Sequence, residues 1–232
     1  MRRILFLCLA AIALTGCGGE ADHSVLFVGN SYTYYNDLPG IVETLGDANG
    51  VSIETEMIAP GGAFLHEHRF NPEVAAAIQS GDFDTVIFQE QSVAPSVLAF
   101  ATENTLPAAE TLDVIADNSG VRVIWFQTWG HFNGFPSEGH PNYESMQSAI
   151  VNTYDAIAER NGGTVARVGE TWRRARETAG TPLYDPDGTH PSPAGSYLAA
   201  ITITETFMSA TVVETPGIDT VDARTAQTLA NS

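Results

Sequence analysis

Short apolar segments alternate along this sequence of 232 residues with longer segments of helical periodicity. The apolar segments predict buried strands at 24–28, 51–58, 84–89, 121–127 and 164–168. The segments between and after them predict helices, of which the last runs from about 193 to 207. Such alternation requires crossover connections, which give a parallel sheet with helices on both faces. The sequence therefore predicts an α/β protein, a flavodoxin-like three-layer α/β/α sandwich with a five-stranded parallel sheet.

The beginning of the chain resembles an export signal. A basic start precedes an apolar run that is too short to span a bilayer. The residues Leu-Thr-Gly-Cys at 14–17 resemble the lipobox of bacterial lipoproteins, in which signal cleavage leaves an acylated cysteine as the first residue. The alternative is an ordinary signal peptide that is cleaved nearby. We therefore expect a signal at 1–16, a tether at 17–23, and an exported protein that a lipid on Cys17 anchors to the cell envelope, in the outer membrane or at the cell surface.

The remaining chain is long enough for one sizeable hydrophobic core and too short for two ordinary domains. We expect a single domain at 24–215 and a loosely packed tail at 216–232, with one short helix capped by Asp219. The only cysteines are Cys8 and Cys17, so the mature chain has neither a disulfide nor a thiol for catalysis.

The charge of the protein restricts its partners. It has 10 basic residues, all of them arginines, against 28 acidic residues, and a net charge of −18. A body this acidic repels phosphate backbones and anionic lipid surfaces. Nucleic-acid binding is therefore not expected, and contact with a membrane would have to come from the lipid on Cys17.

Polar residues follow the predicted strands at the edge of the sheet where parallel sheets bind ligands, beyond the carboxyl ends of the strands. A further polar group precedes the last helix. The segments are Gly29-Asn30-Ser31, Gly61-Gly62, Glu90-Gln91-Ser92 and Asp187-Gly188-Thr189-His190.

These residue types fit acyl transfer. A serine hydroxyl is a weak nucleophile that needs a histidine base, and the histidine needs a carboxylate to fix its tautomer and stabilise its cation. Asp187 and His190 lie three residues apart with a glycine between them, so one turn can bring the carboxylate against the imidazole. An aspartate and a histidine at this spacing are a weak signal by themselves, and their value here comes from the other segments.

Taken together, the motifs at Ser31, at Gly61-Gly62 and at Asp187-Gly-Thr-His190-Pro-Ser resemble the SGNH, or GDSL-like, hydrolase superfamily over roughly residues 25–208. The resemblance implies that Ser31 is the nucleophile and that His190 and Asp187 complete a catalytic triad. It also implies an oxyanion hole made by the Ser31 amide, a glycine amide, for which we choose Gly62 over Gly61, and the side chain of Gln91. No cofactor and no metal are implied.

Two departures from the family pattern matter. Asn30 stands where the namesake motif has aspartate, at a position that is not catalytic. The third block usually reads glycine-x-asparagine-aspartate, but here Gln89-Glu90-Gln91-Ser92 replaces it and puts Gln91 at the asparagine position. Glutamine donates the same hydrogen bond from a side chain that is one methylene longer, so this assignment is the least secure.

Two further groups have alternative interpretations. Trp129, His131 and Phe132 follow the fourth predicted strand, where they either wall a substrate crevice or cover the core. His66 and His68 resemble metal ligands, but a spacing of two places them on different sides of a helix and no third ligand is evident, so we expect no metal.

The sequence thus predicts a serine esterase that hydrolyses short-chain esters, acetyl esters among them, of a carbohydrate or lipid through an acyl-enzyme. The partner would be a small-molecule or carbohydrate ester. The alternative is a non-catalytic surface protein that binds carbohydrate or lipid on a hydrolase fold, and Gln91 is the residue that keeps this alternative open. Acyl transfer to a sugar would use the same residues.

We predict that Cys17→Ser prevents lipid attachment and moves the protein from the membrane fraction to the soluble fraction. The catalytic domain should be unaffected, because the predicted crevice residues are distant in sequence. Membrane fractionation of the two proteins measures this. Unchanged membrane retention would instead indicate an uncleaved signal or a membrane-bound partner.

Overall fold

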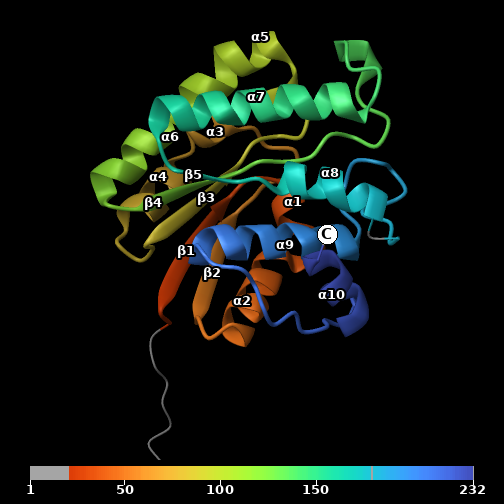
Figure 1. Cartoon of the computed structure of the whole chain (residues 1–232). Coiled ribbons are helices and arrows are strands. Elements are labelled where there is room, and N and C mark those ends of the chain that lie inside the picture. Colours follow the sequence, from red (N-terminus) through yellow and green to blue (C-terminus); the bar gives the residue numbers. More distant parts are fainter. Residues whose placement is uncertain (1–20, 179, 232) are drawn as a thin grey trace, which may run out of the picture.

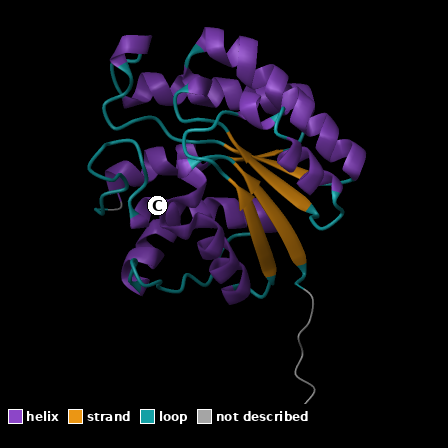
Figure 2. Cartoon of the chain, turned by 180° about the vertical axis from the view of Figure 1, so that it is seen from behind, coloured by secondary structure: helices purple, strands orange, loops and turns teal. Residues whose placement is uncertain are grey.

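A computed structural model describes residues 21–178 and 180–231, so Cys17 and the proposed signal lie outside the described residues. A five-stranded parallel sheet lies between two layers of helices (Figure 1 and Figure 2). The strand order is β2-β1-β3-β4-β5, which is the flavodoxin-like order. The strands are β1 His23–Val28, β2 Ile53–Ile58, β3 Thr85–Gln89, β4 Arg122–Phe126 and β5 Thr164–Ala166. The predicted fold class is therefore confirmed.

One layer of helices contains α3, α4, α6 and α7, and the other contains α2, α8, α9 and α10 (Figure 1). Short helices occupy the loops near the carboxyl ends of the strands. The α-helices are α1 Ser31–Tyr34, α2 Leu38–Ala48, α3 Leu65–His68, α4 Pro72–Gln79, α5 Leu98–Phe100, α6 Leu106–Ser119, α7 Tyr143–Asn161, α8 Val168–Thr178, α9 Pro193–Met208 and α10 Ala223–Ala230.

Alternate side chains of the central strands enter two separate cores. Val25 and Phe27 of β1 face the layer with α2 and α9, whereas Leu26 and Val28 face the layer with α6 and α7. All four are buried. Because both faces of β1 are covered, this strand is apolar from Val25 to Val28, as expected for a parallel sheet between two helical layers.

The tail of the chain is ordered differently from our expectation. The last helix, α10, is capped by Asp222, whose side chain accepts hydrogen bonds from the N–H groups of Arg224 and Thr225. Asp219 lies in the preceding turn and does not cap it. Ala226 and Leu229 are buried in the core beside α9, so the prediction of a loosely packed tail is wrong.

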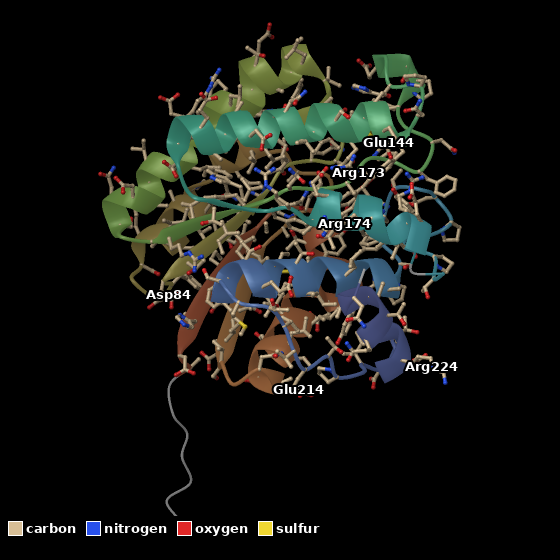
Figure 3. The ribbon with its side chains drawn as sticks, in the orientation of Figure 1. Asp84, Glu144, Arg173, Arg174, Glu214 and Arg224 are labelled. Atoms are coloured by element: carbon tan, nitrogen blue, oxygen red, sulfur yellow. The ribbon has the colours of Figure 1, made fainter. Side chains whose placement is uncertain are left out.

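Surface charges contribute little to this packing. Arg173 on α8 lies 2.9 Å from Glu170 and 3.9 Å from Glu144 of α7 (Figure 3). Exposed pairs of this kind are worth less than about 1 kcal/mol. Within residues 21–178 and 180–231, we find no helix with the length and apolarity that a membrane crossing requires.

The side chain of Gln89, at the end of β3, fixes the end of β1. Its Oε1 atom accepts hydrogen bonds from the Asn30 N–H, at 2.9 Å, and from the Thr33 hydroxyl, at 3.0 Å. It occupies the space beside Gly29, where an added Cβ would lie 2.5 Å from this oxygen. Only glycine therefore lets the chain turn into α1 at this position.

The next residue, Glu90, holds two loops together from inside the protein. Its Oε1 atom accepts hydrogen bonds from the Leu65 N–H, at 3.0 Å, and from the Gln91 N–H, at 2.7 Å, and Oε2 accepts from the Thr105 hydroxyl at 2.6 Å. Burial raises the pKa of the Glu90 carboxyl above its ordinary value, although these hydrogen bonds lower it in part. The carboxyl thus joins the loop after β2 to the loop after β3.

We predict a pH-dependent difference in stability between the wild type and Glu90→Gln. A carboxyl whose pKa is raised by folding stabilises the fold while it is protonated, and this stability is lost as the pH rises through the raised pKa. The glutamine cannot ionise and keeps an acceptor for the two N–H groups. The two proteins are compared at a pH below 4.5, the ordinary pKa of a glutamate side chain, and at pH 8. The free energy of unfolding of Glu90→Gln, relative to that of the wild type, should be higher at pH 8.

Urea unfolding at the two pH values measures this difference. Glu90→Ala leaves two buried N–H groups without an acceptor and should be about 2 to 6 kcal/mol less stable than Glu90→Gln at both pH values. Glu110→Gln, which removes the same charge at an exposed position on α6, is the matched control. Equal pH dependence of wild type and Glu90→Gln would contradict the prediction.

Candidate active site

The loops at the carboxyl ends of β1, β2, β3 and β4 meet the segment that precedes α9 in a cleft of about 450 Å³. Ser31, Gly62, Gln91, His131 and His190 each contribute to its lining, one from each of these five segments. This is the edge of the sheet at which the sequence predicted a ligand crevice.

The turn that carries Ser31 is held by Asn30. The Asn30 Oδ1 atom caps α1 by accepting a hydrogen bond from the Tyr32 N–H at 3.1 Å, and Nδ2 donates to the Ala63 carbonyl at 2.9 Å. An aspartate would cap the helix equally but could not donate the second bond. The departure from the family motif at this position therefore has a structural role, which is to join the Ser31 turn to the loop after β2.

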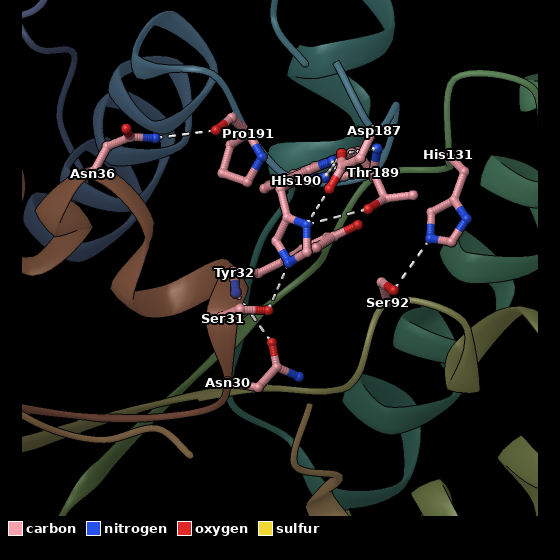
Figure 4. A network of polar contacts seen from close by, with 11 residues as sticks. Asn30, Ser31, Tyr32, Asn36, Ser92, His131, Asp187, Thr189, His190 and Pro191 are labelled. Carbon is pink, nitrogen blue, oxygen red and sulfur yellow. Dashed lines mark hydrogen bonds and ion pairs between the residues drawn. The ribbon is translucent and has the colours of Figure 1, made fainter. Parts of the chain in front are cut away.

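Ser31, His190 and Asp187 form one hydrogen-bonded chain (Figure 4). His190 Nε2 lies 3.0 Å from the Ser31 Oγ, and Nδ1 lies 2.5 Å from the Asp187 Oδ2. The other oxygen of Asp187 accepts hydrogen bonds from the N–H groups of Thr189, at 2.8 Å, and His190, at 2.9 Å. With Nδ1 donating to the carboxylate, Nε2 is the acceptor for the serine proton.

The charge of Asp187 is stabilised by this arrangement. Partial burial raises the pKa of the Asp187 carboxyl, but the hydrogen bonds from the His190 imidazole and from the two backbone N–H groups outweigh it and lower the pKa to about 2. The carboxylate is therefore charged at any pH above about 3 and can stabilise an imidazolium.

Two tyrosines contact the His190 ring, and Asn36 binds the backbone of the residue that follows it. Tyr35 stacks on it with a centroid distance of 4.3 Å, and Tyr32 meets it edge-on at 5.6 Å. The Asn36 Nδ2 donates to the Pro191 carbonyl at 3.0 Å (Figure 4). Nothing local in the sequence indicates that Asn36 reaches a segment 155 positions away, so its role was not predictable.

The predicted oxyanion donors lie around Ser31. Gly61 and Gly62 both line the cleft, so the choice between them stays a prediction. Gln91 lines it too, and its Oε1 accepts hydrogen bonds from the N–H groups of Val93, at 2.7 Å, and Ala94, at 3.2 Å. Since the oxygen is engaged with the backbone, the Nε2 amino group is the end of the side chain left to donate to a substrate.

Of the three proposed substrate residues only His131 lines the cleft, and Trp129 is buried in the core. Trp129 has no exposed surface, and its ring is stacked between Tyr32 and Trp172, at 4.6 and 4.0 Å. Its Nε1 donates to the Thr189 carbonyl at 3.1 Å. The prediction that Trp129 contacts substrate is therefore wrong, because this ring is completed as core by partners from two other segments.

The other two residues are accessible. His131 lines the cleft beside Ser31. Phe132 is 53% exposed and lines a neighbouring hollow of about 610 Å³ on the other side of Asp187.

Of the two histidines in the 66–68 segment, His68 has a structural role. His68 is buried, and its Nε2 lies 2.8 Å from the carbonyl oxygen of Gly29, at the end of β1. Burial lowers the pKa of its imidazole. In the part of the chain that the structure describes, no group of three or more His, Cys, Asp or Glu side chains is placed to hold a metal ion.

Comparison with known proteins yields structural matches only. No family model and no curated protein sequence matches this chain. A protein from Slackia heliotrinireducens, described provisionally as an SGNH hydrolase, is 29% identical, with a TM-score of 0.66 over 80% of this chain and 98% of its own. A DUF4886 family protein from Bacteroides uniformis is 20% identical, with a TM-score of 0.74 over 90% and 93%.

A variant of an acetylxylan esterase from Geobacillus stearothermophilus is 14% identical, with a TM-score of 0.60 over 84% of this chain and 96% of its own. At this identity the likeness concerns the fold alone. These three matches each cover 80% or more of this chain. The resemblance that the motifs predicted is confirmed, and over most of its length this chain has the fold of the SGNH, or GDSL-like, hydrolases and esterases.

Proposed function

We propose that this protein is a serine esterase that hydrolyses short-chain esters through an acyl-enzyme on Ser31. The observation that carries the proposal is the hydrogen-bonded chain from Ser31 through His190 to Asp187. Its two bonds join a nucleophile to a base and the base to a charged carboxylate. Within this hydrogen-bonded series, Ser31 and His190 line a cleft, so a substrate can reach them.

The first half of the reaction follows from these atoms. Ser31 Oγ attacks the ester carbonyl carbon while its proton passes to His190 Nε2, and the Asp187 carboxylate stabilises the imidazolium. The carbonyl oxygen becomes an oxyanion that the N–H groups of Ser31 and Gly62 and the Gln91 amino group stabilise. The bond between the carbonyl carbon and the alkoxy oxygen then breaks, and His190 gives the proton to the departing alcohol oxygen.

The second half uses the same groups. Water gives a proton to His190 and attacks the acyl group on Ser31, and the tetrahedral intermediate expels the serine oxygen, which recovers its proton. The products are the alcohol and a carboxylic acid. Every proton is returned within the cycle, so the reaction as written needs no co-reactant other than water.

A short acyl group on a carbohydrate or lipid alcohol is the substrate class that we propose. An esterase of acetylxylan shares the fold, which supports a carbohydrate ester without deciding it. Export and attachment to the cell envelope through lipid on Cys17 belong to the same proposal, and their support is the sequence alone.

We predict that Ser31→Ala lowers turnover of p-nitrophenyl acetate by about 10⁴-fold or more, because the nucleophile is lost. His190→Ala should be comparably damaging, and Asp187→Ala should be milder because the carboxylate orients and supports the base. Initial rates and labelling by a fluorophosphonate probe measure these effects. A wild-type protein that neither turns over the ester nor reacts with the probe would support the non-catalytic alternative.

We predict that Gln91→Ala lowers kcat by about 10² to 10³-fold with little change in ground-state affinity. The charge on the carbonyl oxygen grows only as Ser31 attacks, so a fixed donor acts mainly in the transition state. Gln91→Asn, with the shorter family donor, should restore the rate only in part. Full activity of Gln91→Ala would show that the donor lies elsewhere in this loop.

A further inference from the structure

The cleft around Ser31 has two different walls. One wall, the aromatic wall, consists of Tyr34 and Tyr35, which follow Ser31 in the chain. The other, the polar wall, consists of Ser92, His131 and Thr189, which come from three separate segments. Figure 4 shows Ser92 and His131 on the side of the triad away from Asn36.

Ser92 and His131 form a fixed pair in the polar wall. His131 Nε2 lies 3.1 Å from the Ser92 Oγ, and Ser92 is only 7% exposed. The backbone N–H of His131 contacts the Met146 sulfur at 3.2 Å, and Phe135 meets the imidazole edge-on at a centroid distance of 6.0 Å. The pair is thus built into the wall by contacts with the body of the protein.

The phenol of Tyr32 is a third polar group at this cleft. The Tyr32 phenol is 3% exposed, and within the described residues its hydroxyl makes no hydrogen bond of acceptable geometry. Burial raises the pKa of this phenol, and the nearby hydroxyls of Ser92 and Thr189 lower it in part. A buried hydroxyl without a hydrogen-bond partner is costly, so the Tyr32 hydroxyl is free to pair with a polar ligand or a water molecule.

The polar wall adjoins the base of the triad, because Thr189 precedes His190 and its hydroxyl lies 3.4 Å from His190 Nδ1. Burial lowers the pKa of the His131 imidazole, which the charge of Asp187 raises and His190 lowers. The leaving alcohol must receive its proton from His190 Nε2 and therefore departs on the side of that ring. A substituent on the alcohol is then the part of the substrate that the polar wall meets.

We propose that Ser92 and His131 bind a free hydroxyl group on the carbon adjacent to the one that carries the esterified oxygen, so the preferred substrates are monoesters of vicinal diols, as in sugars and glycerol. The inference rests on the proposed esterase function and specifies its substrate. A neutral imidazole and a serine hydroxyl each donate and accept, as does an alcohol. An alkyl group in the same place would cover these polar atoms without replacing their hydrogen bonds with water.

Two acetates of equal size test this directly. In 2-hydroxyethyl acetate a hydroxyl takes the place of the terminal methyl group of propyl acetate. We expect the wild type to prefer the hydroxy ester by about 10 to 100-fold in kcat/KM. In Ser92→Ala and in His131→Leu this ratio should fall toward one, whatever their absolute rates.

The matched control is His140→Gln. His140 belongs to the same loop as His131, but its Nε2 lies 2.8 Å from the Ser96 carbonyl oxygen and it does not line the cleft. Its ratio should equal that of the wild type. Fluorophosphonate labelling of all variants checks that each one is folded with a reactive Ser31.

The outcomes separate the inference from the proposed function. A wild type that hydrolyses no ester, p-nitrophenyl acetate included, overturns the proposed function and the inference with it. Equal kcat/KM for the two acetates overturns the inference alone. A preference for propyl glycolate over propyl propionate, without one for the hydroxy acetate, would place the hydroxyl on the acyl part and likewise overturn it.

Discussion

The position of the reacting groups depends on two buried polar side chains at the end of β3. Gln89 accepts hydrogen bonds from Asn30 and Thr33 and so fixes the turn that carries Ser31. Glu90 accepts from the N–H groups of Leu65 and Gln91 and so holds the loops after β2 and β3. Neither side chain can move without leaving buried donors unpaired, which costs about 1 to 3 kcal/mol for each group. The middle of the sheet thereby sets the geometry at its edge.

The strand order explains why these two residues have this reach. Strand β1 lies between β2 and β3, so the loops that follow these three strands begin next to each other. A side chain at the end of β3 can therefore contact both the turn after β1 and the loop after β2. His190 comes from a segment 159 positions beyond Ser31, and Gly195 lets α9 pack closely behind it, because an added Cβ would lie 2.2 Å from the Leu183 carbonyl oxygen.

The sequence predicted the parts of this structure that depend on local patterns. Strand alternation predicted the fold class, and the spacing of Asp187 and His190 predicted their mutual contact, because each depends on neighbours in the chain. The burial of Trp129 was not predictable in this way, since the partners that cover it, Tyr32 and Trp172, are far away in sequence. The role of Glu90 was not predictable either, because its carboxyl is surrounded by groups from three segments.

The buried stack of Tyr32, Trp129 and Trp172 has a consequence for the chemistry. Tyr32 directly follows Ser31 in the chain, and Trp129 Nε1 donates to the carbonyl of Thr189, which directly precedes His190. One aromatic stack therefore supports both Ser31 and His190. In the proposed reaction, proton transfer between these two residues is sensitive to small changes in their separation, so a shared support helps to keep that distance constant. A residue that we expected to bind substrate thus supports the 3.0 Å contact between Ser31 and His190 from within the core.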